Sequence, residues 1–173
     1  MCTQNYIKAV KALYTRADNR YKKVLRAIAA QWALESGWGK SKLAESHSNF
    51  GGMKYRRELS DLCDGVLYTD WEGKEDLYCA LADPEDYCEL YFRFINRPRY
   101  KGINDCLGSD KEFLEHLYDR GYVGSMSGGK ENYVATILSI IDRLPEELRD
   151  PVAVKRQHNI ENSDYPAWLL GTR

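Results

Sequence analysis

The sequence predicts an α+β domain that is mostly α-helical, with a small β-hairpin lobe flanking a cleft. Apolar residues recur at three-and-four spacing along several segments, which is the period of an amphipathic helix. Between about residues 50 and 82, glycines separate short apolar runs, as is typical of strands joined by turns. The chain has 173 residues, 43% of them hydrophobic, which suffices for one compact core. We expect one domain over residues 1–150 and a C-terminal arm over 151–173.

Two helices are expected in the N-terminal part of the chain. The first runs from about Thr3 to Tyr14. The second ends at Gly37 and Gly39, because glycine tolerates the left-handed backbone conformation of a helix C-cap. The apolar stripe of this second helix consists of Val24, Leu25, Ile28, Ala29 and Trp32.

Three further helices follow the hairpin lobe. Asp83 and Pro84 open the first, as N-cap residue and first helical residue. Ser109 and Glu112 form a capping box that opens the second. The third runs from about Lys130 to Leu144.

The remaining segments carry weaker signals. Strands are expected at residues 66–69 and 77–81, where β-branched and aromatic residues gather. The segment 151–173 is expected to be an irregular arm. Its expected docking residues are Tyr165, Trp168 and Leu169.

Glu35 lies where a carboxylic acid has no structural reason to be. It follows Ile28 by seven positions and Trp32 by three, so it continues the apolar stripe and points inward. Burial and the negative end of the helix dipole both disfavour a carboxylate, and both raise the pKa toward that of a general acid. The alternative is a structural glutamate that reaches solvent past Trp32 or pairs with an arginine.

The residues around Glu35 carry a family resemblance. Residues 33–41 (Ala-Leu-Glu-Ser-Gly-Trp-Gly-Lys-Ser) and 49–54 (Asn-Phe-Gly-Gly-Met-Lys) resemble the signature of the peptidoglycan glucosaminidases of glycoside hydrolase family 73. This family includes the hydrolase domain of the flagellar rod-assembly protein and several autolysins. The likeness spans roughly residues 20–144 and implies a lysozyme-like glucosaminidase domain within 1–150. Its later segments are 96–100, 121–122 and 131–135.

Glycoside hydrolysis commonly uses two carboxyl groups, and Glu35 fits the role of the group that protonates the leaving oxygen. The resemblance places the second acid on the β-lobe, where Thr69-Asp70-Trp71 resembles the family's Thr-Glu-Tyr. Asp70 is therefore the first candidate. Glu72 is the reserve candidate, because alternate positions of a strand share a face. For either residue the alternative is a solvated hairpin charge. Inverting and substrate-assisted mechanisms both stay open.

Several other residues are expected to line the groove. Tyr122 and Tyr133 match aromatic positions of the family opposite the acid, which implies stacking on sugar rings and hydrogen bonds to the N-acetyl group. Asn49 and Phe50 are expected at the groove floor as substrate-binding residues, with Phe50 either packing against Trp38 or touching sugar. A basic group is expected either to meet carboxylates of the wall polymer or to form a solvated turn. Its members are Lys54, Arg56 and Arg57.

Composition and charge argue against several classes of function. A net charge of −1 and a pI of about 6.3 argue against a nucleic-acid binder. Five irregularly spaced cysteines and three scattered histidines predict neither a metal site nor a cofactor. The start of the sequence lacks the pattern of a secretory signal, and no segment is long enough to span a membrane. We therefore expect synthesis in the bacterial cytoplasm and action in the periplasm or cell wall, after secretion, type VI-like injection or phage lysis.

The leading hypothesis is an endo-β-N-acetylglucosaminidase that cleaves the glycan strand of peptidoglycan after N-acetylglucosamine. It predicts an antibacterial lytic effector whose producer holds a cognate immunity protein that blocks the active site. One alternative is a muramidase or lytic transglycosylase, which cuts at the other sugar. The other is a non-catalytic module that binds the cell wall.

Overall fold

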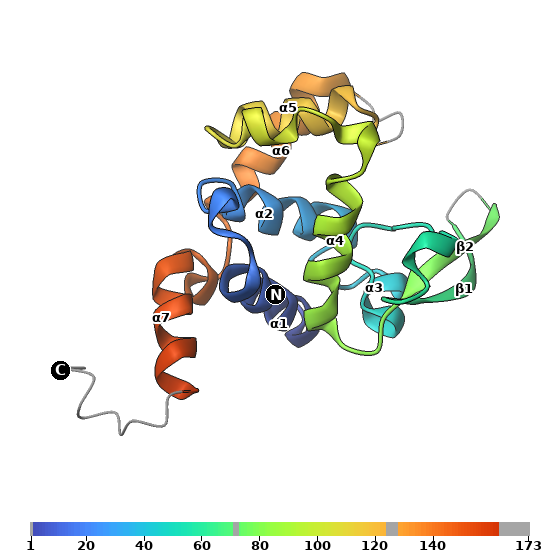
Figure 1. Cartoon of the computed structure of the whole chain (residues 1–173), viewed down its shortest axis with the longest axis horizontal. Helices are drawn as coiled ribbons and strands as arrows, with labels where there is room; N and C mark the ends of the chain where they lie inside the picture. The colour runs from blue at the N-terminus through green and yellow to red at the C-terminus, as the bar shows by residue number, and fades with distance from the viewer. Residues whose placement is uncertain (1, 71–72, 124–127, 163–173) are drawn as a thin grey trace.

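The computed structural model describes residues 2–70, 73–123 and 128–162. Within these ranges the chain forms seven α-helices, several short 3-10 turns and one two-stranded antiparallel sheet (Figure 1). The strands are β1 (Asp64–Thr69) and β2 (Glu75–Ala80). The helices are α1 (Gln4–Arg16), α2 (Leu25–Ser36), α3 (Lys42–His47), α4 (Tyr87–Ile95), α5 (Asp110–Asp119), α6 (Gly129–Ile141) and α7 (Pro151–Glu161). None of these helices combines the length and apolarity needed to cross a membrane.

Helix α2 lies at the centre of the helical part, with α1 on one side and α5 and α6 on the other (Figure 1). Nine of its twelve residues are buried, because its sequence is apolar on almost every side. Trp32 is fully buried, and its ring meets the rings of Tyr87 and Tyr91 edge-on at 4.8 and 5.3 Å between centroids. The helix that carries Glu35 is therefore a core element with little freedom to shift.

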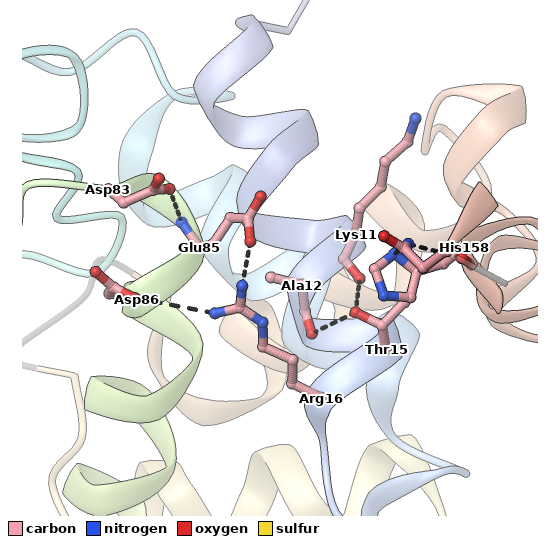
Figure 2. Close-up of polar contacts among 9 residues, drawn as sticks. Lys11, Ala12, Thr15, Arg16, Asp83, Glu85, Asp86 and His158 are labelled. Carbon is pink, nitrogen blue, oxygen red and sulfur yellow. Dashed lines mark hydrogen bonds and ion pairs between the residues drawn. The ribbon is translucent and has the colours of Figure 1, made fainter. Parts of the chain in front are cut away.

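Helix α1 contacts the start of α4 through polar groups. Figure 2 shows Arg16 reaching the 3-10 turn Pro84–Asp86, where it pairs with Glu85 and lies 3.9 Å from the Asp86 carboxylate. Asp83 caps this turn by accepting a 2.8 Å hydrogen bond from the Glu85 N–H. Exposed ion pairs of this kind are each worth about 0–1 kcal/mol, so the buried face of α4 contributes most of the stability here.

The β-lobe is an antiparallel hairpin whose register runs from Asp64 opposite Ala80 to Thr69 opposite Glu75. The chain before it adds an isolated bridge between Lys54 and Tyr78 on the other edge of β2. In Figure 1 the hairpin extends to one side of the helical part, connected through α3 and α4. A small β-lobe beside a mostly helical body is the predicted architecture, and the structure confirms it.

The expected helices are present, with boundaries that shift by a few residues. Helix α1 continues to Arg16, and α6 begins at Gly129 and ends at Ile141. Pro84 opens a 3-10 turn that leads into α4, so the α-helix itself begins three residues later than expected. Ser109 caps α5 as predicted, by accepting a 3.2 Å hydrogen bond from the Glu112 N–H.

The expectation of an irregular arm after residue 150 is wrong for its first half. Residues Pro151–Glu161 form α7, which packs against α1 and buries Val154. Asp150 accepts a hydrogen bond from the Val152 N–H and proline holds the first helical position. Figure 2 shows His158 of this helix beside Lys11 and Thr15. The proposed docking residues Tyr165, Trp168 and Leu169 lie outside the described ranges.

Candidate active site

The chain after Glu35 is held by a tight helix ending. Gly37 has the left-handed conformation (φ 57°) that the sequence predicts, and its N–H donates to carbonyl groups of the last helical turn. The Trp38 N–H donates to the Ala33 carbonyl at 2.8 Å. The Ser36 hydroxyl donates to the Trp32 carbonyl at 2.6 Å and accepts from the Gly39 N–H at 2.8 Å. These bonds fix the last turn of α2 and thereby the position of the Glu35 side chain.

Glu35 lines a cavity of about 610 Å³ between the helical part and the β-lobe. Its Oε1 atom is buried and has no hydrogen-bond partner among the described residues. Burial raises the pKa of Glu35 from 4.5 to about 7, and a hydrogen bond with the Tyr133 side chain acts in the opposite direction. No ion pair within the described ranges includes Glu35, so the arginine pairing considered as the alternative is not observed there. The residue is a half-buried acid with one buried oxygen, and its pKa lies close to neutral pH.

A chain of three polar side chains lies behind Glu35. The Tyr91 hydroxyl donates to Gln31 Oε1 at 2.6 Å, and Gln31 Nε2 donates to the Tyr133 hydroxyl oxygen at 2.7 Å. An amide nitrogen only donates, so the Tyr133 oxygen accepts this bond and its own proton is left for another acceptor. Tyr133 is 0% exposed. The expected stacking of Tyr133 on a sugar ring is therefore wrong for this structure, because the ring is enclosed by protein.

Tyr122 lines the cavity, as expected from the sequence. Its backbone N–H donates to the Leu117 carbonyl at 2.9 Å, which fixes the chain after α5. The hydroxyl groups of Tyr122 and Tyr87 are both buried, without a hydrogen-bond partner among the described residues. A Cβ atom at Gly51 would lie 2.4 Å from the Tyr87 hydroxyl oxygen and 3.0 Å from that of Tyr122. Glycine at position 51 thus lets both hydroxyl groups come close to the loop after α3.

Asp70 lies on the opposite side of the same cavity, immediately after β1. Its N–H donates to the Lys74 carbonyl at 2.9 Å, and its Oδ1 accepts from the Lys74 N–H at 2.9 Å. These bonds close the hairpin turn. Tyr68, two residues earlier on the strand, also lines the cavity, as expected for positions that share a strand face. The structure therefore brings Glu35 and Asp70 to one cavity, whereas Glu72 lies outside the described residues.

Asn49 and Phe50 are buried beneath the cavity and do not reach its surface. Asn49 is 1% exposed, and its amide joins the loop after α3 to the β-lobe through hydrogen bonds of 2.9 and 3.0 Å to the Met53 and Cys79 carbonyls. Phe50 is 0% exposed and packs edge-on against the rings of Tyr6 and Tyr87. The expectation that these residues bind substrate directly is corrected to a supporting role, because neither side chain is accessible.

Basic residues line the cavity from both sides. Lys54 and Arg56 belong to the β-lobe side, as the sequence suggested, but Lys54 pairs with Asp76 at 2.7 Å. Two further arginines, Arg97 and Arg99, follow α4; they belong to the segment 96–100 of the family resemblance, but no binding role was predicted for them. Arg99 donates to the Arg120 and Gly121 carbonyls at 2.6 and 3.1 Å, which holds the segment that leads to Tyr122.

Solved structures of similar fold come from two bacteria. The glycoside hydrolase domain of FlgJ from Salmonella typhimurium superposes with a TM-score of 0.62 at 20% identity, covering 94% of this chain and 100% of that domain. A peptidoglycan hydrolase from Sphingomonas sp. A1 superposes with a TM-score of 0.61 at 18% identity, covering 88% of this chain and 95% of that one. At these identities the likeness shows a shared fold.

The sequence itself carries the family assignment. No curated protein matches the chain. Residues 11–146 match the glucosaminidase family, described as mannosyl-glycoprotein endo-beta-N-acetylglucosaminidase. This match covers most of the chain and includes every described residue that lines the cavity. The chain therefore belongs to the glucosaminidase family and is a glycoside hydrolase.

Proposed function

We propose that this peptidoglycan-directed endo-β-N-acetylglucosaminidase uses Glu35 as its general acid and Asp70 as its second carboxyl group. The observation that carries the proposal is the state of Glu35. It is a carboxyl with a pKa of about 7 that lines the cavity, and its buried oxygen has no hydrogen-bond partner among the described residues. A general acid works best when its pKa lies near the operating pH, since it then holds a proton and releases it readily.

In the proposed reaction, the glycan strand lies in the cavity with the β-1,4 bond after N-acetylglucosamine beside Glu35. Protonated Glu35 gives its proton to the bridging oxygen while the bond from that oxygen to the anomeric carbon breaks. Positive charge develops on the sugar ring, and water then attacks the anomeric carbon, or the oxygen of the substrate's own N-acetyl group attacks it first. Asp70 activates the water in the first case and orients the N-acetyl group in the second. Water finally supplies the new hydroxyl group on the anomeric carbon.

The two tyrosines have different proposed roles. Tyr122 lines the cavity, which suits contact between its ring and a sugar of the strand, while its hydroxyl group is buried close to that of Tyr87. Tyr133 is enclosed and acts as a positioning residue, because it orients the Glu35 carboxyl and limits the rise of its pKa. Asn49 and Phe50 support the cavity from below.

The proposed site of action is the periplasm or cell wall, where peptidoglycan lies. In this proposal the enzyme is an antibacterial lytic effector that reaches the wall by secretion, injection or phage lysis. A producer of such an effector needs an immunity protein that covers the cavity containing Glu35 and Asp70. Copurification of the enzyme with the product of a neighbouring gene, with loss of wall digestion in the complex, is the expected result. Full digestion by the complex would contradict it.

Product analysis tests the proposed chemistry. Purified sacculi are digested with the wild type and with Glu35→Gln, and the products are reduced with borohydride before mass spectrometry. The matched control is Glu45→Gln, which changes an exposed glutamate of α3 outside the cavity. Reduced N-acetylglucosamine ends from the wild type and the control, absent with Glu35→Gln, are expected. Reduced muramic ends would indicate a muramidase, anhydro ends a transglycosylase, and no products a wall-binding module.

A further inference from the structure

The cavity is richer in positive charge than the chain as a whole. Four basic residues of the described ranges line it, Lys54, Arg56, Arg97 and Arg99, although the net charge of the chain is −1. Among the described residues, the acidic members of its lining are Glu35 and Asp70, the two proposed to take part in the reaction. A local excess of positive charge in a concave site favours an anionic ligand, because low-dielectric walls concentrate the field there.

The four basic residues differ in their ion-pair and hydrogen-bond partners. Lys54 is paired with Asp76, so its charge is largely compensated. Arg99 donates to two backbone carbonyl groups and holds the segment before Tyr122. Arg56 is exposed and donates to the carbonyl of its neighbour Tyr55 at 2.9 Å. Arg97 has a different environment.

The Arg97 guanidinium is held in place by an aromatic ring and a backbone carbonyl, and not by an ion pair with a carboxylate of the described residues. It lies over the Phe94 ring at 3.9 Å from the centroid, and its Nε donates to the Phe94 carbonyl at 3.2 Å. Its charge also acts on Tyr100, where it opposes the rise in the tyrosine pKa that burial causes. Phe94 in turn packs edge-on against Tyr122 at 5.8 Å between centroids, which connects Arg97 to a proposed substrate-binding tyrosine. No ion pair within the described ranges includes Arg97.

These contacts prepare Arg97 for a ligand. A guanidinium presents a planar fork of donors that matches a carboxylate, and a fork already held in place loses little conformational entropy on binding. Its aromatic support is part of the cavity wall, so the charge lies beside the space where the glycan strand is expected. Because the amino sugars of a glycan strand are uncharged when acetylated and peptide-linked, the carboxylates available near the strand belong to the stem peptide.

We propose that Arg97, with Arg56 on the β-lobe side of the cavity, binds a stem-peptide carboxylate of the peptidoglycan strand. This anion subsite makes the enzyme prefer strands that carry charged stem peptides over strands that are neutral. The inference rests on the proposed peptidoglycan hydrolase function. It adds that the cavity selects strands by the charge of their stem peptides.

The test compares two forms of one substrate. Soluble glycan strands with intact stem peptides are divided in two, and one half is treated with carbodiimide and ammonia to convert the carboxylates to amides. Steady-state cleavage of both halves is measured by the appearance of reducing N-acetylglucosamine ends. For the wild type, kcat/KM is expected to be about tenfold higher on the charged strands, as for the loss of one charge-assisted hydrogen-bond pair.

Three variants make this test specific. Arg97→Gln is expected to lose about tenfold in kcat/KM on charged strands, mainly through KM, and to cleave amidated strands like the wild type. Arg97→Lys keeps the charge and is expected to retain part of the preference. The matched control is Arg20→Gln, because Arg20 also lies over an aromatic ring, that of Tyr21 at 5.0 Å, but is outside the cavity lining. It should behave like the wild type on both substrates.

The outcomes separate this inference from the proposed function. Equal cleavage of both substrates by the wild type would contradict the anion subsite and leave the glucosaminidase function intact. An equal loss on both substrates for Arg97→Gln would also contradict it, since that result indicates a packing role against Phe94. Absence of N-acetylglucosamine ends from both substrates would contradict the proposed function itself.

Discussion

The two sides of the cavity hold their carboxyl groups in contrasting ways. Glu35 belongs to the last turn of a buried helix and is surrounded by core side chains and a polar network from α4 and α6. Asp70 belongs to a hairpin turn that is closed by short-range bonds to Lys74. The outer face of this hairpin is open, since the facing pair Leu67 and Leu77 are 64% and 41% exposed.

This contrast indicates that the two carboxyl groups have different requirements. Glu35 needs a shifted pKa, whereas Asp70 needs a position that can adjust to the substrate. Desolvation by the core shifts the pKa of Glu35, which requires a rigid and dry environment. The hairpin carries few buried apolar contacts, and segments of that kind open at low free-energy cost. We therefore expect the helical side to set the chemistry and the hairpin side to adapt to the strand as it binds.

The largest expected effect is on activity when Glu35 is changed. Glu35→Gln removes the proton donor and keeps the size of the side chain, so kcat/KM should fall by about 10²–10⁴-fold, the usual contribution of a general acid. Release of reducing ends from soluble strands measures it. A loss below about tenfold would show that another residue is the general acid. The comparison of Glu35 with Asp70 would then no longer describe the catalytic groups.

The same substitution is expected to raise stability at alkaline pH. The folded pKa of Glu35 is about 7 and its ordinary value is 4.5, so the protonated acid favours the folded state below pH 4.5 and this contribution is lost as the pH rises through 7. Glutamine does not titrate. Relative to the wild type, Glu35→Gln should gain up to about 3 kcal/mol in the free energy of unfolding at pH 8, and little at pH 4. Urea denaturation at both values measures this. A gain that is equal at both pH values would show that the Glu35 carboxyl is not desolvated.

A smaller loss of activity is expected when the hairpin carboxyl is changed. Asp70→Asn should lower kcat/KM by about tenfold or more, because it removes either the base or the group that orients the N-acetyl oxygen. Glu72→Gln is the informative comparison, since it alters the reserve candidate two residues away. If Glu72→Gln has the larger effect, the second carboxyl is Glu72, and the assignment of Asp70 is wrong.

The smallest expected effect concerns the polar network behind Glu35. Because the hydrogen bond with Tyr133 lowers the pKa of Glu35, Tyr133→Phe should raise that pKa above about 7. The fall of kcat/KM at alkaline pH should then move to higher pH, by less than about one unit. The control is Tyr118→Phe, whose ring packs against Tyr133 at 5.7 Å between centroids. An unchanged pH profile for Tyr133→Phe would show that Tyr133 does not interact with the acid.

The sequence predicted those parts of the site that depend on local signals. The inward direction of Glu35 follows from the spacing of one helix, and its position in the last turn follows from Gly37. The position of Tyr122 on the cavity was predicted from the family resemblance. Helix α7 could have been predicted as well, because Asp150-Pro151 repeats the Asp83-Pro84 pattern that was used to place α4.

The parts that were missed depend on contacts between distant segments. Gln31 is one helical turn before Glu35, but its partners Tyr91 and Tyr133 lie 60 and 102 residues away. Spacing along the chain carries no information on such pairs. The same limit explains why Tyr133 was expected on a sugar ring: a matched position gives a residue type and a side of the site, and only the packing around it decides whether the ring is enclosed.

The measurement that tests the central claim most directly is the digestion of purified sacculi by the wild type, Glu35→Gln and Glu45→Gln, with identification of the reduced ends by mass spectrometry. Reduced N-acetylglucosamine ends from the wild type and Glu45→Gln, and none from a folded Glu35→Gln, are the predicted result. The same ends from Glu35→Gln at the wild-type rate would contradict the claim that Glu35 is the catalytic acid.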